Sequence, residues 1–119
     1  MKTIGIIGSR RRNTPLDYMA VKSKFLELYK SGDYIVSGGC PKGADNFAED
    51  LAKSMGIPII IFHPNWEQKG RAAGIIRNTE IAKRVKVLIA CVAKDRTGGT
   101  EDTIKKFLHQ TSEDKLYIV

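Results

Sequence analysis

The sequence is poor in residues that build disulfide-linked, metal-bound or membrane-spanning proteins. Its only two cysteines, Cys40 and Cys91, allow at most one disulfide, and their spacing from His63 and His109 fits no zinc pattern. No apolar run approaches the ~20 residues of a membrane span, and the apolar part of residues 1–8 is too short for an export signal. We therefore expect a cytoplasmic protein with no metal, no cofactor and no membrane partner.

Two common nucleotide-binding signatures are also missing. The order Gly-x-x-x-x-Gly-Lys-Ser/Thr, which forms the phosphate loop of many nucleoside triphosphatases, does not occur. No Gly-x-Gly-x-x-Gly follows the first apolar run, and Ser37 stands where a dehydrogenase would carry its ribose-binding acid. These absences disfavour triphosphate hydrolysis and hydride transfer.

The overall composition is that of one globular domain with an excess of positive charge. Residues 1–119 can bury roughly two-thirds of the surface that the unfolded chain exposes, and 42% of them are hydrophobic. Lys and Arg number 20 against 13 Asp and Glu, a formal net charge of +7. Such a balance favours anionic partners, either nucleotides or nucleic acid.

Apolar runs and helical periodicity alternate along the whole chain. We expect strands at 2–7, 34–36, 57–62, 85–92 and 116–119. We expect helices at 15–29, 44–55 and 75–84, a last helix opened by the glycine turn 97–100, and an irregular stretch at 63–74. The alternation predicts an α/β fold: a single-domain, Rossmann-like three-layer sandwich of about five parallel strands with helices on both faces.

Several local signals refine this pattern. Thr14 is expected to cap the first helix, with Pro15 at its first position. Pro58 cannot donate a ladder hydrogen bond, so it should lie at a strand start or on an edge strand. The helical stripes are expected to bury Met55 and Leu108.

The chain is organised around the glycine-rich stretch 36–45, Val-Ser-Gly-Gly-Cys-Pro-Lys-Gly-Ala-Asp, between an apolar run and a helix. Its glycines allow a tight turn and close approach of a ligand, and the following helix start offers free N–H groups, which suits phosphate. In a parallel sheet the loops 8–10, 37–43 and 94–100 should converge on the carboxyl edge, where ligands bind.

Basic residues surround these loops, but acidic residues offset most of their charge. Nine cations lie in or just after the strand-end loops: Arg10, Arg11, Arg12, Lys42, Lys69, Arg71, Arg77, Lys94 and Arg96. Six acids accompany them: Asp45, Glu67, Glu80, Asp95, Glu101 and Asp102. A local excess of about three charges suits one or two phosphates better than a long polyanion. Trp66 is the only large stacking aromatic in these loops.

Five motifs in order resemble those of the SLOG superfamily, and of its small stand-alone YspA/YpsA-related branch in particular. They are Gly8-Ser9-Arg10, Val36 to Gly39 with Gly43-Ala44-Asp45, His63-Pro64-Asn65-Trp66, Ala73 to Asn78, and Gly99-Thr100. The resemblance covers nearly the whole chain. It implies a Rossmann-like domain that binds a nucleotide or a nucleotide-derived ligand of the AMP, NAD or ADP-ribose type, and a homodimer paired through helices.

Two more distant resemblances point to different activities. The LONELY GUY phosphoribohydrolases, once called lysine decarboxylases, combine a glycine turn, a glutamate and an upstream arginine, which would correspond here to Glu101 or Asp102 and Arg77. The turn Thr97–Thr100 is shorter than theirs. The DNA-processing protein A family binds single-stranded DNA, and that activity is the alternative function.

These arguments select a set of candidate site residues. The ligand-binding candidates are Gly8, Ser9, Arg10, Ser37, Gly38, Gly39, Lys42, Gly43, Asp45, Trp66, Arg77, Asn78, Gly98, Gly99 and Thr100. The catalytic candidates for hydrolysis of an N-glycosidic bond are Glu101, Asp102 and Arg77. Helix capping or dipole complementation remains the alternative role of Glu101, Asp102 and Asp45, and local backbone capping that of Ser9 and Ser37.

Overall fold

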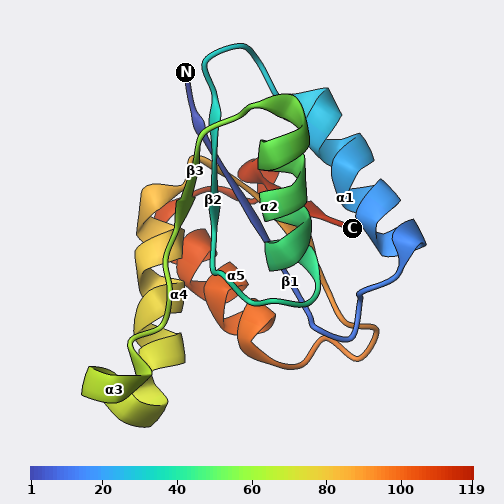
Figure 1. Cartoon of the computed structure of the whole chain (residues 1–119). Coiled ribbons are helices and arrows are strands. Elements are labelled where there is room, and N and C mark those ends of the chain that lie inside the picture. The colour runs from blue at the N-terminus through green and yellow to red at the C-terminus, as the bar shows by residue number, and fades with distance from the viewer.

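The computed structural model describes residues 1–119, which form a five-stranded parallel sheet between two layers of helices (Figure 1). The strands, in chain order, are β1 (Thr3–Gly8), β2 (Tyr34–Ser37), β3 (Ile59–Ile61), β4 (Val87–Cys91) and β5 (Leu116–Ile118). Their order in the sheet is β3-β2-β1-β4-β5, with every pair parallel. The predicted Rossmann-like α/β fold is confirmed.

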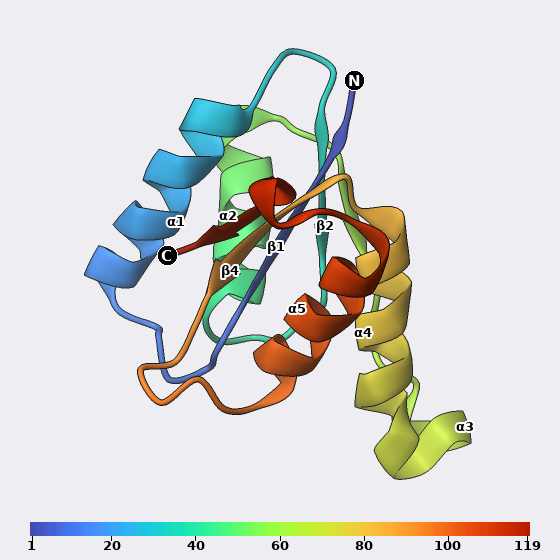
Figure 2. The same ribbon diagram turned by 180° about the vertical axis from the view of Figure 1, so that it is seen from behind.

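The helices cover the two faces of the sheet in pairs. Helices α1 (Pro15–Leu28) and α2 (Ala44–Met55) lie on one face, and α4 (Ala73–Arg84) and α5 (Gly99–Gln110) on the other (Figures 1 and 2). Because both faces are covered, the strands read as continuous apolar runs. Within β1, Ile6 packs into the core under α1 and α2, whereas its neighbour Ile7 packs under α4 and α5. No helix combines the length and apolarity that crossing a membrane requires.

The predicted helix cap at Thr14 and the predicted position of Pro58 are both confirmed. The Thr14 hydroxyl accepts a hydrogen bond from the backbone N–H of Asp17 at 3.2 Å, and the Asp17 carboxylate accepts one from the backbone N–H of Thr14 at 3.1 Å. This reciprocal capping fixes the start of α1. Pro58 directly precedes β3, which is an edge strand of the sheet.

The prediction of an irregular stretch at 63–74 is wrong. It contains the short helix α3 (Trp66–Lys69), a 3₁₀ turn at Gly70–Ala72 and the first residues of α4. The reason is the side chain of Asn65, which accepts a hydrogen bond from the backbone N–H of Gln68 at 3.2 Å and so caps α3. A second 3₁₀ turn, Glu113–Lys115, leads into β5.

Two residues expected in the core are partly exposed instead. Met55 is 38% exposed because it is the last residue of α2, and Leu108 is 39% exposed because its neighbour Phe107 takes the buried position on α5. Strands β3 and β4 are also shorter than the apolar runs 57–62 and 85–92 that contain them. Ile57, Val85 and Val92 are buried although they lie outside the strands, so hydrophobicity alone overestimates strand length.

The loops after β1, β2 and β4 meet at the carboxyl edge of the sheet, at the lower end of the view in Figure 1. Gly43 shows how closely they pack. It has φ +79°, and a Cβ built on it would lie 2.6 Å from the carbonyl oxygen of Ser9. Only glycine allows the loops after β1 and β2 to touch in this way.

Candidate functional site

A two-part groove lies at this edge, over the point where the strand order reverses beside β1. Its inner cleft, of about 130 Å³, is lined by Ile7, Gly8, Arg10, Cys40, Asp45, Arg77, Asn78, Ile81, Gly99, Thr100 and Thr103. Its outer compartment, of about 300 Å³, is lined by Arg10, Gly38, Gly39, Cys40, Pro41, His63, Pro64, Trp66 and Arg77. The two parts share Arg10, Cys40 and Arg77, so both arginines stand on the boundary between them.

Arg77 is held in place by the glycine loop. Its Nη1 donates to the carbonyl oxygen of Gly38 at 2.5 Å, and its Nε donates to Oδ1 of the neighbouring Asn78 at 3.0 Å. A Cβ on Gly38 would lie 2.6 Å from that same Nη1, so a larger residue would displace the guanidinium. The contacts leave Nη2 available, which gives a pre-positioned donor at the groove for an anion.

Asn78 connects α4 to the start of α5. Its side-chain amide is largely buried and donates to the carbonyl oxygen of Gly99 at 3.2 Å and to the carboxylate of Asp102 at 3.1 Å. Lys106 also donates to the Asp102 carboxylate, at 2.9 Å. Burial opposes ionisation of Asp102, but the hydrogen bonds from Lys106 and Asn78 outweigh it and lower its pKa. Asp102 is therefore an ionised carboxylate engaged with its own helix and α4.

Asp45 is the buried carboxylate of the inner cleft. It lies in the first turn of α2, is only 7% exposed, and accepts a hydrogen bond from the backbone N–H of Cys40 at 3.1 Å. Burial raises its pKa, although the Cys40 N–H and the charge of Arg77 act in the opposite direction. No lysine or arginine lies within ion-pair distance of it.

The start of α5 forms another wall of the inner cleft through Gly99 and Thr100. Its N-cap residue is Gly98, which has φ +107° and offers no side chain to satisfy the first backbone N–H groups. Helix α2 likewise begins after a glycine, Gly43, without a side-chain cap. Free N–H groups and the positive end of the helix dipole favour an anion near these termini.

Of the three catalytic candidates, the two carboxylates Glu101 and Asp102 lie outside the groove. Glu101 forms a two-contact ion pair with Arg96, at 2.8 and 2.9 Å, and neither Glu101 nor Asp102 lines the groove. Arg77, the third candidate, lines both parts. A role of Glu101 or Asp102 in bond cleavage stays a prediction.

Three of the nine basic candidates, Arg11, Arg12 and Arg96, pair with carboxylates and hold loops together. Arg11 pairs with Asp95 at 2.8 and 2.9 Å and also donates to Thr97. Arg12 pairs with Asp17 at 2.8 Å and donates to the backbone oxygens of Val92, just after β4, and of Val119. Of the nine predicted cations, only Arg10 and Arg77 line the groove.

The other predicted ligand residues divide between wall and support. Among the supports, the Ser9 hydroxyl accepts from the N–H of Arg11 and the buried Ser37 hydroxyl donates to the carbonyl of Asp45, so both cap local backbone. Gly43 donates its N–H to Asn13 at 2.8 Å, and Lys42 is exposed outside the groove. On the wall, Gly8, Asp45, Asn78, Gly99 and Thr100 line the inner cleft, and Gly38, Gly39 and Trp66 the outer compartment.

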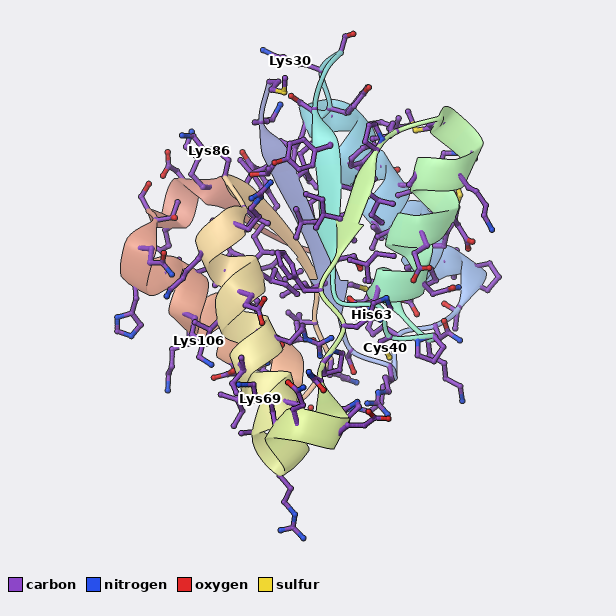
Figure 3. All side chains as sticks on the ribbon, turned by 60° about the vertical axis from the view of Figure 1, so that its left-hand side comes forward. Lys30, Cys40, His63, Lys69, Lys86 and Lys106 are labelled. Atoms are coloured by element: carbon purple, nitrogen blue, oxygen red, sulfur yellow. The ribbon has the colours of Figure 1, made fainter.

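The outer compartment is lined in part by two side chains with aromatic rings, Trp66 and His63. Trp66 is 57% exposed, and His63 packs so closely on Gly39 that a Cβ there would lie 2.6 Å from the histidine Nδ1. Figure 3 shows His63 and Cys40 near one another at the end of the sheet. An exposed indole beside an arginine provides a surface on which a planar base can stack.

Sequence reasoning missed some lining residues. Cys40 belongs to both parts of the groove and Thr103 to the inner cleft, yet neither was selected as a ligand residue. Helical spacing could have found Thr103, since it lies three residues after Thr100 and four after Gly99 on the same face of α5. Asn13, which supports Gly43 from the β1–α1 loop, carries no comparable signal.

Comparisons with known proteins add nothing to this geometry. No model of a protein family matches the chain, and neither a curated protein nor a solved structure matches it either.

Proposed function

We propose that this protein binds a phosphorylated nucleotide or nucleotide-derived ligand of the AMP, NAD or ADP-ribose type in the two-part groove. The phosphate lies in the inner cleft beside Arg10 and Arg77, near the start of α5. The base lies in the outer compartment against Trp66. The protein acts as a sensor of such a ligand or as a weak phosphoribohydrolase.

One observation carries this proposal: the two arginines of the groove stand on the boundary between its parts. A phosphate bound there would have a pre-positioned guanidinium on one side and uncapped helix N–H groups on the other. The outer compartment then extends from the same boundary toward an exposed indole. A molecule with an anionic end and a planar end fits this layout.

Hydrolysis of the ligand would further require a carboxylate next to its sugar. Cleavage of an N-glycosidic bond develops positive charge on the sugar, which a nearby carboxylate stabilises. Glu101 and Asp102 would have to leave Arg96 and Lys106 to do so. Release of free base from AMP, lost in Glu101→Ala and Arg77→Ala, supports hydrolysis, and absence of release limits the protein to binding.

Single-stranded DNA is the alternative ligand, and its support is the net charge of +7. The pairing of Arg11, Arg12 and Arg96 with carboxylates leaves less free charge at the carboxyl edge than the sequence suggests. A fluorescence titration with a labelled oligonucleotide at two salt concentrations separates the two ligands, because DNA binding through phosphates weakens steeply with salt.

The proposal is tested on metabolite-free protein by the thermal midpoint with saturating AMP, NAD or ADP-ribose. At least one ligand should raise the midpoint, because binding to the folded state alone stabilises it by about 2.7 kcal/mol at a hundredfold excess over Kd. Arg77→Ala should remove most of this increase.

Lys94→Ala is the matched control. It removes one positive charge from the same edge of the protein but lies outside the groove, so it should keep the increase. Equal losses in both variants would show that only the general charge matters. No increase with any of the three ligands would refute the proposed function.

A further inference from the structure

Four carboxylates lie at the carboxyl edge near the β4–α5 loop and the groove, and they differ in what neutralises them. Asp95, Glu101 and Asp102 each pair with a basic side chain, namely Arg11, Arg96 and Lys106. Asp45 pairs with none, although it is far more deeply buried. It is also the only one of the four that lines the groove.

A buried carboxylate without an ion pair is costly unless something else satisfies it. The oxygen of Asp45 that faces Gly38 accepts the N–H of Cys40. The backbone N–H groups of Cys40 and Gly38 both act to lower the pKa of Asp45, but a carboxylate has about four acceptor positions, so capacity for further donors remains. That capacity lies in the wall of the inner cleft, next to the arginines on the boundary.

The position of Asp45 also limits what can lie beside it. A second phosphate there would meet a buried negative charge, whereas a neutral donor would complete the hydrogen bonding of the carboxylate. In a phosphorylated nucleoside the neutral donors next to the phosphate are the hydroxyl groups of the sugar. The cleft thus joins an anion-binding side, at Arg10 and Arg77, to a side that accepts hydroxyl donors.

We infer that Asp45 determines specificity in the inner cleft by accepting a hydrogen bond from a ribose hydroxyl of the ligand. This inference rests on the proposed function and makes it narrower. The site selects a phosphorylated ribose over the same molecule without sugar hydroxyls, and it disfavours DNA, whose internal sugars carry no free hydroxyl group. Asp45 is assigned to recognition here and not to bond cleavage.

The test is calorimetric titration of the whole protein with AMP and with 2′,3′-dideoxy-AMP, which lacks both hydroxyls. The wild-type protein should bind AMP at least about tenfold more tightly, because a hydrogen bond to a charged acceptor is among the stronger ones. Asp45→Asn, which keeps shape but loses charge, should reduce this ratio to about threefold. Asp45→Leu, which removes the acceptors, should bring it close to one.

Glu49→Gln is the matched control, since Glu49 lies one turn further along α2 and outside the groove. It should keep the wild-type ratio. A purely structural role of Asp45 would lower the thermal midpoint of its variants and leave the ratio unchanged, which would overturn the inference. Equal binding of both ligands by the wild type would also overturn it while the proposed function stands. Binding of neither ligand by the wild type would refute both.

Discussion

The two glycine turns that open α2 and α5 reach the same edge of the sheet but are built in opposite ways. In the first turn, a Cβ on Gly38, Gly39 or Gly43 would lie within 2.6 Å of Arg77, His63 or Ser9 respectively. In the second turn, a Cβ on Gly98 would meet nothing within 4 Å. The first turn is therefore defined by packing and the second by backbone conformation alone.

The second turn is held from outside by two exposed ion pairs. Arg11 reaches Asp95 from the β1–α1 loop, and Arg96 reaches Glu101 on α5. Arg96 itself has φ +55°, which is a strained conformation for a residue with a side chain. Exposed ion pairs contribute little to stability. The first turn is thus packed closely around Arg77 and Asp45, whereas the second is held mainly by ion pairs at the surface.

The largest expected effect comes from adding one methyl group to each turn. Gly43→Ala should lower the free energy of unfolding by about 3 kcal/mol, since it combines a positive φ with a backbone overlap that cannot relax easily. Gly98→Ala should cost about 1 kcal/mol, because only its positive φ is unfavourable. Urea unfolding of both variants measures the difference. Equal losses would remove the distinction between a packed and an open turn.

The fold was predictable because local sequence patterns indicate each strand and helix of a parallel α/β architecture. Buried strands, amphipathic helices and the cap at Thr14 are each encoded within a few neighbouring residues. Helix α3 was missed since a single turn of helix has too few residues for a periodic pattern, and its cap at Asn65 lies in a motif-rich loop. The convergence of loops followed from strand direction alone.

The candidate site was harder to predict, because pairing among charged residues depends on contacts between distant segments. Arg11 and Asp95 are 84 residues apart, and the local sequence around neither residue indicates that they form an ion pair. Glu101 and Arg96 are close in sequence, yet only the path of the turn decides that they pair. The sequence therefore predicts that these charged residues lie at one edge of the sheet. It does not distinguish the side chains that line the groove from those that hold the loops together.

A second variant sharpens the comparison at the centre of the first turn. A Cβ on Gly38 would overlap the flexible end of Arg77 and the carboxylate of Asp45, so these side chains can move aside. Gly38→Ala should cost only about 1 kcal/mol of stability but weaken AMP binding about tenfold, as the guanidinium loses its position. Calorimetry gives the affinity and urea unfolding the stability. Gly98→Ala is the control, with a similar loss of stability and a smaller loss of affinity.

The smallest effect, a pH dependence, should have opposite signs in the two turns. The pKa of Asp45 is raised above its ordinary value of 3.8 by burial, so its contribution to stability is full below that pH and is lost as the pH rises through the folded value. Asp95 behaves in the reverse way. Its hydrogen bonds from Arg11 and Thr97 lower its pKa, so its contribution is present above 3.8 and is lost as the pH falls through the folded value.

Asp45→Asn and Asp95→Asn separate these two contributions when urea unfolding is followed from pH 2.5 to 7. Relative to wild type, Asp45→Asn should gain stability as the pH rises above 4, because it no longer ionises inside the cleft. Relative to wild type, Asp95→Asn should lose stability as the pH rises from 2.5 to 5, because the stability that the wild-type ion pair contributes grows over that range. High salt should reduce this loss, since both partners of the pair are exposed. Trends of the same sign in both variants would mean that the first turn is as open to solvent as the second.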